Sequence, residues 1–225
     1  MAAFTGADKT NIARVLEEQV SEYQENMGDA VVSIAFHDLK GKIPDFSIQG
    51  QKPGWSASII KVPVMIETFG AIDRGEISLY DELIVDHCYT LEPIDHVSTL
   101  PMGTGITVDE LLHHMIVASD NEATNMLAER LGLEKINQTA ETLGTKRTML
   151  AHLLAPNVPR LYTSWNEEGS NLTTAEDMTA LLTAIYTNRA ATPESCATMR
   201  KILEKGGGTI LGKYLPYGTT IGGKV

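Results

Sequence analysis

The sequence predicts an α+β fold in which an antiparallel sheet with flanking helices adjoins an all-helical region. Residues 30–48 show the pattern of a β-hairpin, and residues 219–225 show that of a further strand. Most of the middle of the chain carries helical periodicity. Segments 1–50 and 206–225 are therefore expected to form one discontinuous, sheet-containing subdomain, and residues 51–205 an all-helical subdomain.

The N-terminal elements are expected in the order helix, strand, strand. Residues 8–27 place apolar side chains, among them Ile12 and Leu16, on one stripe of a helix. Residues 30–37 have the composition of a strand, and residues 43–48 return as its hairpin partner after a short polar turn. One helix of the sheet-containing subdomain would thus precede its first two strands.

The middle of the chain is expected to be a succession of helices. The run at 56–69 is apolar on nearly every side, which indicates a buried helix, and Pro63 predicts a local distortion near Ile59 rather than an end. Thr107, with Glu110 three residues later, has the pattern of a capping box and opens the next helix. Further helices are predicted over residues 133–143, 174–188 and 193–205.

The composition is that of a globular protein and argues against several classes of function. The 225 residues carry a net charge of −11, which disfavours nucleic acid or an anionic membrane as a partner, because both attract clustered Lys and Arg. No apolar run approaches the length of a membrane span. Cys88 and Cys196 are far apart, and no Cys/His spacing indicates a metal site.

Ser58 and Lys61 stand three residues apart in the apolar run. If the run is helical, the two side chains share one face, so the hydroxyl meets the amine. Burial disfavours the charged form of a lysine, and a neutral amine beside a serine hydroxyl can take its proton. The pair therefore indicates a nucleophile with its base. The alternative is a core helix with a capping serine and a lysine that extends to solvent.

Ser119, Asp120 and Asn121 form a polar triplet between two apolar helical segments. These residue types are poor in helix interiors and common at caps and turns. The triplet therefore predicts a helix break whose polar side chains point into a shared space. The alternative is that it only caps the following helix.

Together the two motifs resemble those of the active-site serine penicillin-recognising enzymes, and among them the class A β-lactamase-like serine hydrolases. That family carries Ser-x-x-Lys, Ser-Asp-Asn and Lys-Thr-Gly in this order. The gap between Ser58 and Ser119 is similar to that of the family, and the resemblance extends over nearly the whole chain. It implies a β-lactamase/transpeptidase-like fold.

The resemblance also implies a role for each motif residue. Ser58 attacks the substrate after Lys61 has deprotonated its hydroxyl, and Ser119 relays a proton to the leaving nitrogen. Asn121 positions the lysine and the substrate amide, and Lys224 contributes to substrate binding and tunes Ser119 electrostatically. The resemblance implies neither a metal nor a cofactor.

The third motif departs from the family pattern. Lys224 takes the place of the motif lysine, but Val225 stands where threonine or serine is expected, and the sequence stops there. In the family, the residue after this strand supplies one oxyanion-hole N–H, and the nucleophile supplies the other. We expect that the chain is a fragment, or that a second chain or a swapped copy supplies the C-terminal strands. Alone, it would be unstable or would associate.

The base for deacylation is the second departure. Class A β-lactamases use a glutamate on an omega-shaped loop, and counting from Gly144 places Leu154 near that position, whereas another register places Tyr162 there. Glu167 and Glu168 lie further along the loop and are candidate bases, with solvated loop charges as the alternative. Acylation is therefore better supported than efficient turnover.

The sequence thus predicts a serine hydrolase that forms an acyl-enzyme with β-lactams or related amides. One alternative is a D-Ala-D-Ala peptidase or an esterase with the same acylation apparatus. A second is a penicillin-binding module without turnover, and a third is an inert structural fragment. The resemblance suggests an exported, periplasmic or extracellular protein, but this N-terminus lacks the pattern of a signal peptide, so the compartment stays open.

Overall fold

The computed structural model describes residues 6–28, 30–89, 95–154, 163, 166–207 and 219–224. The N-terminal elements are α1 (Gly6–Met27), β1 (Ile34–Phe36), β2 (Phe46–Ile48) and β3 (Gly54–Trp55). They are followed by a 3-10 helix (Ala57–Ile60), α2 (Lys61–Asp73), β4 (Glu82–Ile84), a second 3-10 helix (Val97–Thr99), β5 (Gly105–Thr107), α3 (Val108–Val117), α4 (Asn121–Leu131) and α5 (Leu133–Thr142). The last elements are β6 (Leu172–Thr173), α6 (Ala175–Tyr186) and α7 (Pro193–Gly207).

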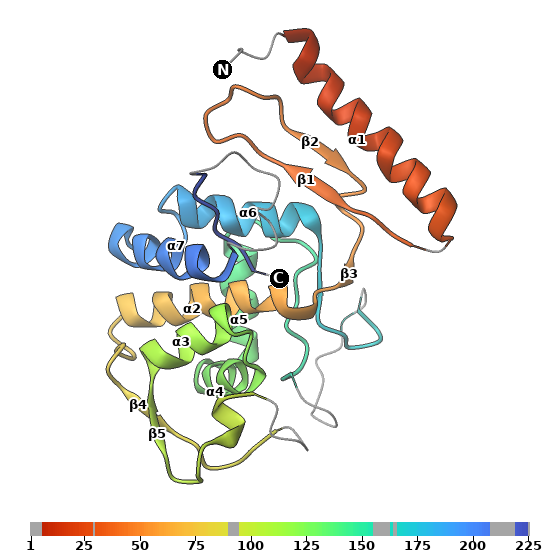
Figure 1. Cartoon of the computed structure of the whole chain (residues 1–225). Coiled ribbons are helices and arrows are strands. Elements are labelled where there is room, and N and C mark those ends of the chain that lie inside the picture. The colour runs from red at the N-terminus through yellow and green to blue at the C-terminus, as the bar shows by residue number, and fades with distance from the viewer. Residues whose placement is uncertain are drawn as a thin grey trace.

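Helix α2 is the centre of the helical part of the molecule (Figure 1). It contacts α3, α4, α5, α6 and α7, and every residue from Ile60 to Phe69 is buried. Burial on all sides is what its apolar sequence predicts. Pro63 is the third residue of α2, where its missing N–H is tolerated, and the turn before α2 is a 3-10 helix. The distortion predicted near Ile59 is therefore confirmed.

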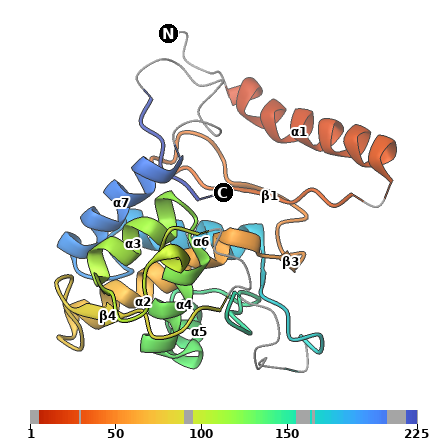
Figure 2. The same ribbon diagram turned by 60° about the horizontal axis from the view of Figure 1, so that its bottom comes forward.

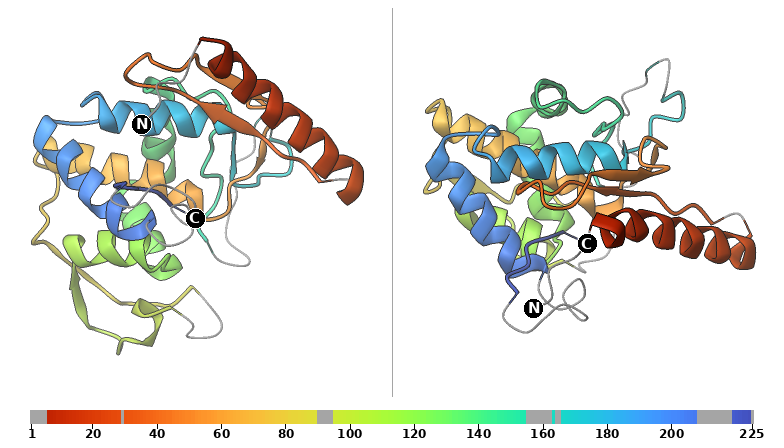
Figure 3. Two further views of the ribbon diagram at one scale, coloured as in Figure 1. Left: turned by 45° about the horizontal axis from the view of Figure 1, so that its top comes forward. Right: turned by 90° about the horizontal axis from the view of Figure 1, so that it is seen from above.

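Strands β1 and β2 form the predicted hairpin and pair antiparallel. The rings of Phe36 and Phe46 lie opposite each other and stack with centroids 5.1 Å apart, a cross-strand contact that stabilises the hairpin. Helix α1 lies along one side of the hairpin, and α6 packs against β1 from the other (Figures 1 and 3). In Figure 2, α1 stands clear of the bundle that the other helices form. The hairpin therefore joins α1 to the helical bundle.

The C-terminal segment differs from the strand predicted over 219–225. Within residues 219–224, which the structure describes, no strand is present. Instead, the Gly223 N–H donates to the Leu203 carbonyl of α7 at 3.0 Å. Glycine at 222 permits this approach, because a Cβ there would lie only 3.3 Å from Leu203 Cβ. The segment docks on α7 rather than pairing with the hairpin, because its backbone finds a partner there.

The predicted helices agree with the structure to within two residues at each end for α1, α5, α6 and α7. The capping box at the start of α3 is also confirmed, with Thr107 and Glu110 bonded reciprocally. The short pairs β3–β6 and β4–β5 were not predicted, because two or three residues carry no readable alternation. Within the described ranges, none of the helices combines the length and the hydropathy needed to cross a lipid bilayer.

Candidate active site

Ser58 lies in the 3-10 turn that leads into α2. The turn is anchored by buried Ser56, which donates both its N–H and its hydroxyl to the Asn171 carbonyl, each at 3.0 Å. Ala57 follows with a φ of 43°, a left-handed conformation that is strained for a residue with a side chain. Residues three apart in a 3-10 turn eclipse each other, so Ser58 and Lys61 face the same way.

Lys61 is fully buried and is held by polar partners. Its Nζ donates to the Ser119 carbonyl, to Ser119 Oγ at 3.1 Å and to Asn121 Oδ1 at 2.8 Å. Ser58 Oγ lies 3.4 Å from the same Nζ and accepts a hydrogen bond from Ser119 Oγ at 2.9 Å. The structure thus brings the four motif residues into one hydrogen-bonded cluster. A lysine that extends to solvent is excluded, because the amine ends on interior acceptors.

The triplet 119–121 breaks the chain between α3 and α4, as predicted. Ser119 has a φ of 61°, a left-handed conformation just after the end of α3. Asp120 is the N-cap of α4 and accepts a hydrogen bond from the Ala123 N–H at 2.9 Å. Its two neighbours bond Lys61. The triplet therefore both caps a helix and contributes side chains to the polar cluster.

The electrostatic surroundings of Lys61 favour its neutral form. Burial is the largest cause that lowers its pKa from 10.5 to about 8, and the positive charge of Lys224 acts in the same direction. The carboxylates of Asp95 and Asp120 oppose this shift. Lys224 is itself partly buried, and burial lowers its pKa as well. A large fraction of Lys61 is therefore neutral near pH 8, and this is the form that accepts a proton.

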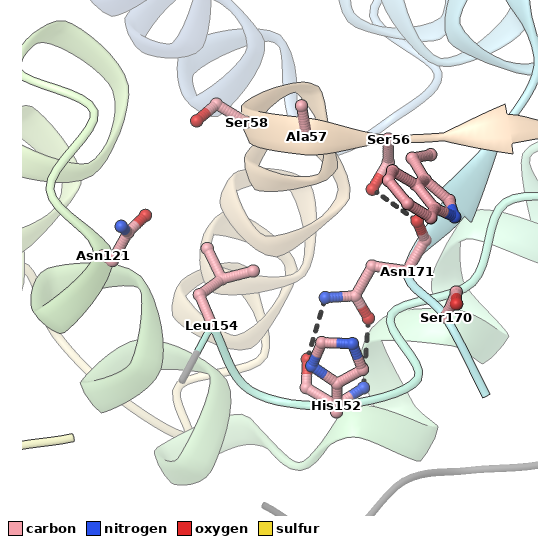
Figure 4. Close-up of a pocket in the computed structure, with 9 residues that line it drawn as sticks. Ser56, Ala57, Ser58, Asn121, His152, Leu154, Ser170 and Asn171 are labelled. Atoms are coloured by element: carbon pink, nitrogen blue, oxygen red, sulfur yellow. Dashed lines mark hydrogen bonds between the residues drawn. The ribbon is translucent and has the colours of Figure 1, made fainter. Parts of the chain in front are cut away.

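A cavity of about 540 Å³ opens beside Ser58. It is lined by Trp55, Ser56, Ala57, Ser58, Asn121, His152, Leu154, Ser170 and Asn171. Figure 4 shows Leu154 between Asn121 and His152. The Leu154 N–H donates to Asn125 Oδ1 of α4 at 2.7 Å, which fixes the loop against that helix. The cavity lining combines polar side chains with the apolar side chains of Trp55, Ala57 and Leu154, a mixture that suits a ligand with amide bonds.

Neither of the two candidate deacylation bases belongs to the lining of this cavity. Glu167 and Glu168 are exposed on the turn after Asn166, and neither lines the cavity. Among the described residues that line it there is no carboxylate, whereas Leu154, predicted near the position of the family glutamate, does line it. Tyr162, the candidate of the other register, lies outside the described residues.

Three polar residues that hold the cavity loop and the triplet in place were not singled out by the sequence patterns. Asn171 Oδ1 accepts hydrogen bonds from the Ala151 N–H at 2.7 Å and the His152 N–H at 3.0 Å. Asn125 holds the same loop, and Asp95 accepts a hydrogen bond from the backbone of the triplet. Of these three residues, only Asn125 could have been found from the sequence. It is a polar residue at a buried helix position, four residues after Asn121.

Comparisons with known proteins give a consistent result. The family model described as "Beta-lactamase enzyme family" matches residues 12–225. The β-lactamase of Rhodobacter capsulatus is 29% identical over 153 residues, which are 68% of this chain and 50% of that relative. The chain thus spans about half the length of this curated relative, and 60% of a second, the β-lactamase VEB-1 of Pseudomonas aeruginosa.

Solved structures confirm the predicted fold. A β-lactamase from Sphaerobacter thermophilus has a TM-score of 0.77 at 27% identity, covering 90% of this chain and 74% of that one. PBP-A, solved as a leucine-to-glutamate mutant in an acyl-enzyme complex with penicillin G, has a TM-score of 0.72 at 22% identity. That match covers 85% of this chain and 69% of the PBP-A chain, and at this identity the likeness concerns the fold alone.

Proposed function

The chain belongs to the β-lactamase enzyme family, and from that premise we propose that it is a serine hydrolase that forms an acyl-enzyme with β-lactams or related amides. One observation carries the proposal: Ser58, Ser119 and buried Lys61 form a single hydrogen-bonded cluster at the edge of a cavity. A serine hydroxyl beside an amine with a depressed pKa is an activated nucleophile.

In the proposed acylation, neutral Lys61 takes the proton of Ser58 while Oγ attacks the carbonyl carbon of the substrate amide. The carbonyl oxygen of the substrate then carries the negative charge of the tetrahedral intermediate. When the C–N bond breaks, Ser119 gives its proton to the leaving nitrogen and receives one from Lys61. The acyl group then rests on Ser58, Lys61 is neutral again, and every proton is accounted for.

Asn121 and Lys224 are proposed to hold the substrate. The side-chain oxygen of Asn121 accepts a hydrogen bond from Lys61, so its amide nitrogen is the end that can donate to a substrate carbonyl. Lys224 is close enough to Lys61 to lower its pKa, and it is the cation suited to a substrate carboxylate. One oxyanion donor would be the Ser58 N–H. Losing one such donor typically lowers the rate by about 10²–10³.

The second candidate is a penicillin-binding module that acylates without turnover, and Leu154 favours it. Deacylation needs a base to activate water, and general-base catalysis contributes about 10²–10⁴ in rate. Leucine lines the cavity near the position expected for that base, and Glu167 and Glu168 lie on an exposed turn. A peptidase or an esterase that shares the acylation step is compatible with the same cluster.

Intact-mass spectrometry after incubation with penicillin G, followed by peptide mapping, tests the proposal. We expect a mass increase equal to the whole β-lactam on Ser58, because the ring nitrogen stays attached when the lactam opens. Ser58→Ala should abolish the label, whereas Ser170→Ala, a matched change in another serine of the cavity, should retain it. Label on Ser56 or Ser119 in place of Ser58 would refute the assignment.

A further inference from the structure

Two carboxylates fasten the segment 95–99 to the start of α4. Asp95 Oδ2 accepts a hydrogen bond from the Asn121 N–H at 2.8 Å, and Asp120 Oδ2 in turn accepts one from the Val97 N–H at 2.9 Å. Val97 and Asp120 are buried, so their bond is shielded from solvent. Each carboxylate satisfies a backbone donor of the other segment, which fixes the two segments relative to each other.

The bond to Asn121 bears on the polar cluster because Asn121 is the first residue of α4. N–H groups in the first turn have no partner within the helix, and a negative charge there is favourable. The Asp95 carboxylate meets this donor, while the side chain of Asn121 accepts a hydrogen bond from Lys61 at 2.8 Å. Asp95 is therefore linked to the Lys61 amine through a single residue.

We propose that Asp95 is a positioning residue of this site, which holds Asn121 against Lys61 and contributes negative charge beside the amine. The inference rests on the proposed function, since it assigns Asp95 a part in acylation. Within the part of the chain that the structure describes, the charged groups that act on Lys61 are Asp95, Asp120 and Lys224. The two carboxylates raise the pKa of Lys61, whereas burial and Lys224 lower it, so Asp95 helps to set the pH at which the base becomes available.

Asp95 is the carboxylate whose charge can be changed without disturbing the N-cap of α4. Asp120 caps α4 through the Ala123 N–H, so replacing it would weaken the helix start. Asp95 holds Asn121 with one oxygen, and asparagine offers an amide oxygen of the same geometry. The imidazole rings of His96 and His114 stack close to this segment, with 4.6 Å between their centroids, so the readout must report the Lys61 amine itself.

The test compares Asp95→Asn, which removes the charge and keeps an acceptor, with Asp95→Ala, which removes both. Acylation by penicillin G is followed from about pH 5 to about pH 10. For Asp95→Asn the acid limb should move to lower pH, and the rate at about pH 6 should rise roughly two- to tenfold, because each unit lost from the pKa of Lys61 multiplies its neutral fraction about tenfold. For Asp95→Ala the rate should fall at every pH, because Asn121 is released.

The matched control is Asp109→Asn, in the first turn of α3 at the opposite end from Ser119. It removes one carboxylate charge from a neighbouring element and should leave the pH profile of acylation unchanged. An equal shift in this variant would mean that net charge, and not the position of Asp95, moves the profile, and the inference would be wrong.

A titration of the free protein separates this inference from the proposed function. The ¹³C chemical shift of the Lys61 side chain, followed by NMR against pH, reports its pKa without substrate, and Lys61→Met assigns the signal. A lower pKa in Asp95→Asn than in the wild type supports the inference. Absence of any penicillin label on Ser58 would refute the proposed function alone. An unchanged pKa, together with an unchanged acylation profile, would overturn the inference while the acylation stands.

Discussion

Lys61 is a fully buried lysine whose amine lies at the centre of the candidate site. An ammonium taken out of water is destabilising by several kcal/mol unless hydrogen bonds replace its hydration. The oxygens of Ser119 and Asn121 around Nζ supply those bonds. In the proposed acylation, the burial that disfavours the charged amine is also what makes the neutral amine available as a base. Stability and the proposed activity are therefore opposed at this residue.

The pKa of Lys61 makes stability depend on pH in a defined window. Its folded value of about 8 lies below the ordinary 10.5, so the unfolded chain binds more protons between these values. Relative to Lys61→Met, the free energy of unfolding of the wild type should therefore rise as pH increases from about 8 to about 10.5, by at most about 3 kcal/mol. Below about pH 8 the difference should be constant. Urea unfolding of both proteins checks this, and a flat difference throughout would contradict it.

The prediction for turnover depends on Leu154. With leucine lining the cavity, we expect a burst of acylation followed by a slow phase. Leu154→Glu should accelerate deacylation, by up to about 10²–10⁴, because a carboxylate there can activate water. Leu154→Gln is the matched control, with the same shape and no base. Stopped-flow measurements with a chromogenic cephalosporin report both phases.

Fast linear turnover by the wild type would show that a different base operates. Loss of that turnover in Glu167→Gln or Glu168→Gln would then identify which of these exposed glutamates reaches the acyl-enzyme.

At the scale of elements, two short structures orient Ser58, the proposed nucleophile. The pair β3–β6 sets Trp55 opposite Leu172, and the bonds of Ser56 to Asn171 tie the following turn to the same place. The 3-10 helix then directs Ser58 toward the cluster before α2 begins. A side chain on a loop and a helix start that are anchored in this way is held more tightly than a side chain on a free loop.

The capping box at the start of α3 allows a prediction that concerns stability and not catalysis. Thr107 Oγ1 accepts from the Glu110 N–H at 3.2 Å, and the Thr107 N–H donates to Glu110 Oε2 at 3.0 Å. Thr107→Ala should lower the free energy of unfolding by about 1 kcal/mol, whereas Thr107→Ser should restore most of it. Because this cap lies at the far end of α3 from Ser119, the acylation rate should not change. Parallel loss of rate and stability would show that the two ends are coupled.

Across the whole molecule, burial is uneven. The residues of α2 from Lys61 to Phe69 are buried, whereas Tyr23 of α1 is 48% exposed and the residues of β1 are only partly covered. Among the described residues, the hairpin β1–β2 has no third strand. Two-stranded hairpins are marginal in water, and an open strand edge invites pairing. The N-terminal part therefore depends on α1 and α6 for its stability.

Hydrogen–deuterium exchange should show this unevenness. We expect the amides of α1 and of the hairpin to exchange faster than those of α2, because local opening is easier where fewer apolar contacts are lost. Mass spectrometry of peptic fragments measures the difference. Equal protection in a sample that sediments as a monomer would contradict the expectation. Equal protection in a dimer would instead indicate that a second copy covers the exposed edge.

Interactions between residues close in the chain were enough to predict much of this protein. The helices α1, α5, α6 and α7, the hairpin, and the capping box at Thr107 follow from periodicity and cap chemistry. The shared face of Ser58 and Lys61 follows from a spacing of three residues. The motif pair pointed to the fold family, because its order along the chain is itself a sequence property.

Only the tertiary structure decided how the segments around the cluster are held together. The bonds from Asn121 to Asp95, from Leu154 to Asn125 and from Ser56 to Asn171 join residues that are far apart in the chain. The docking of residues 219–224 on α7, in place of the predicted strand, is of the same kind. Such contacts depend on which faces pack together. Local propensity does not encode that choice. The same short sequence pattern can form its backbone hydrogen bonds with whichever segment the fold brings close to it.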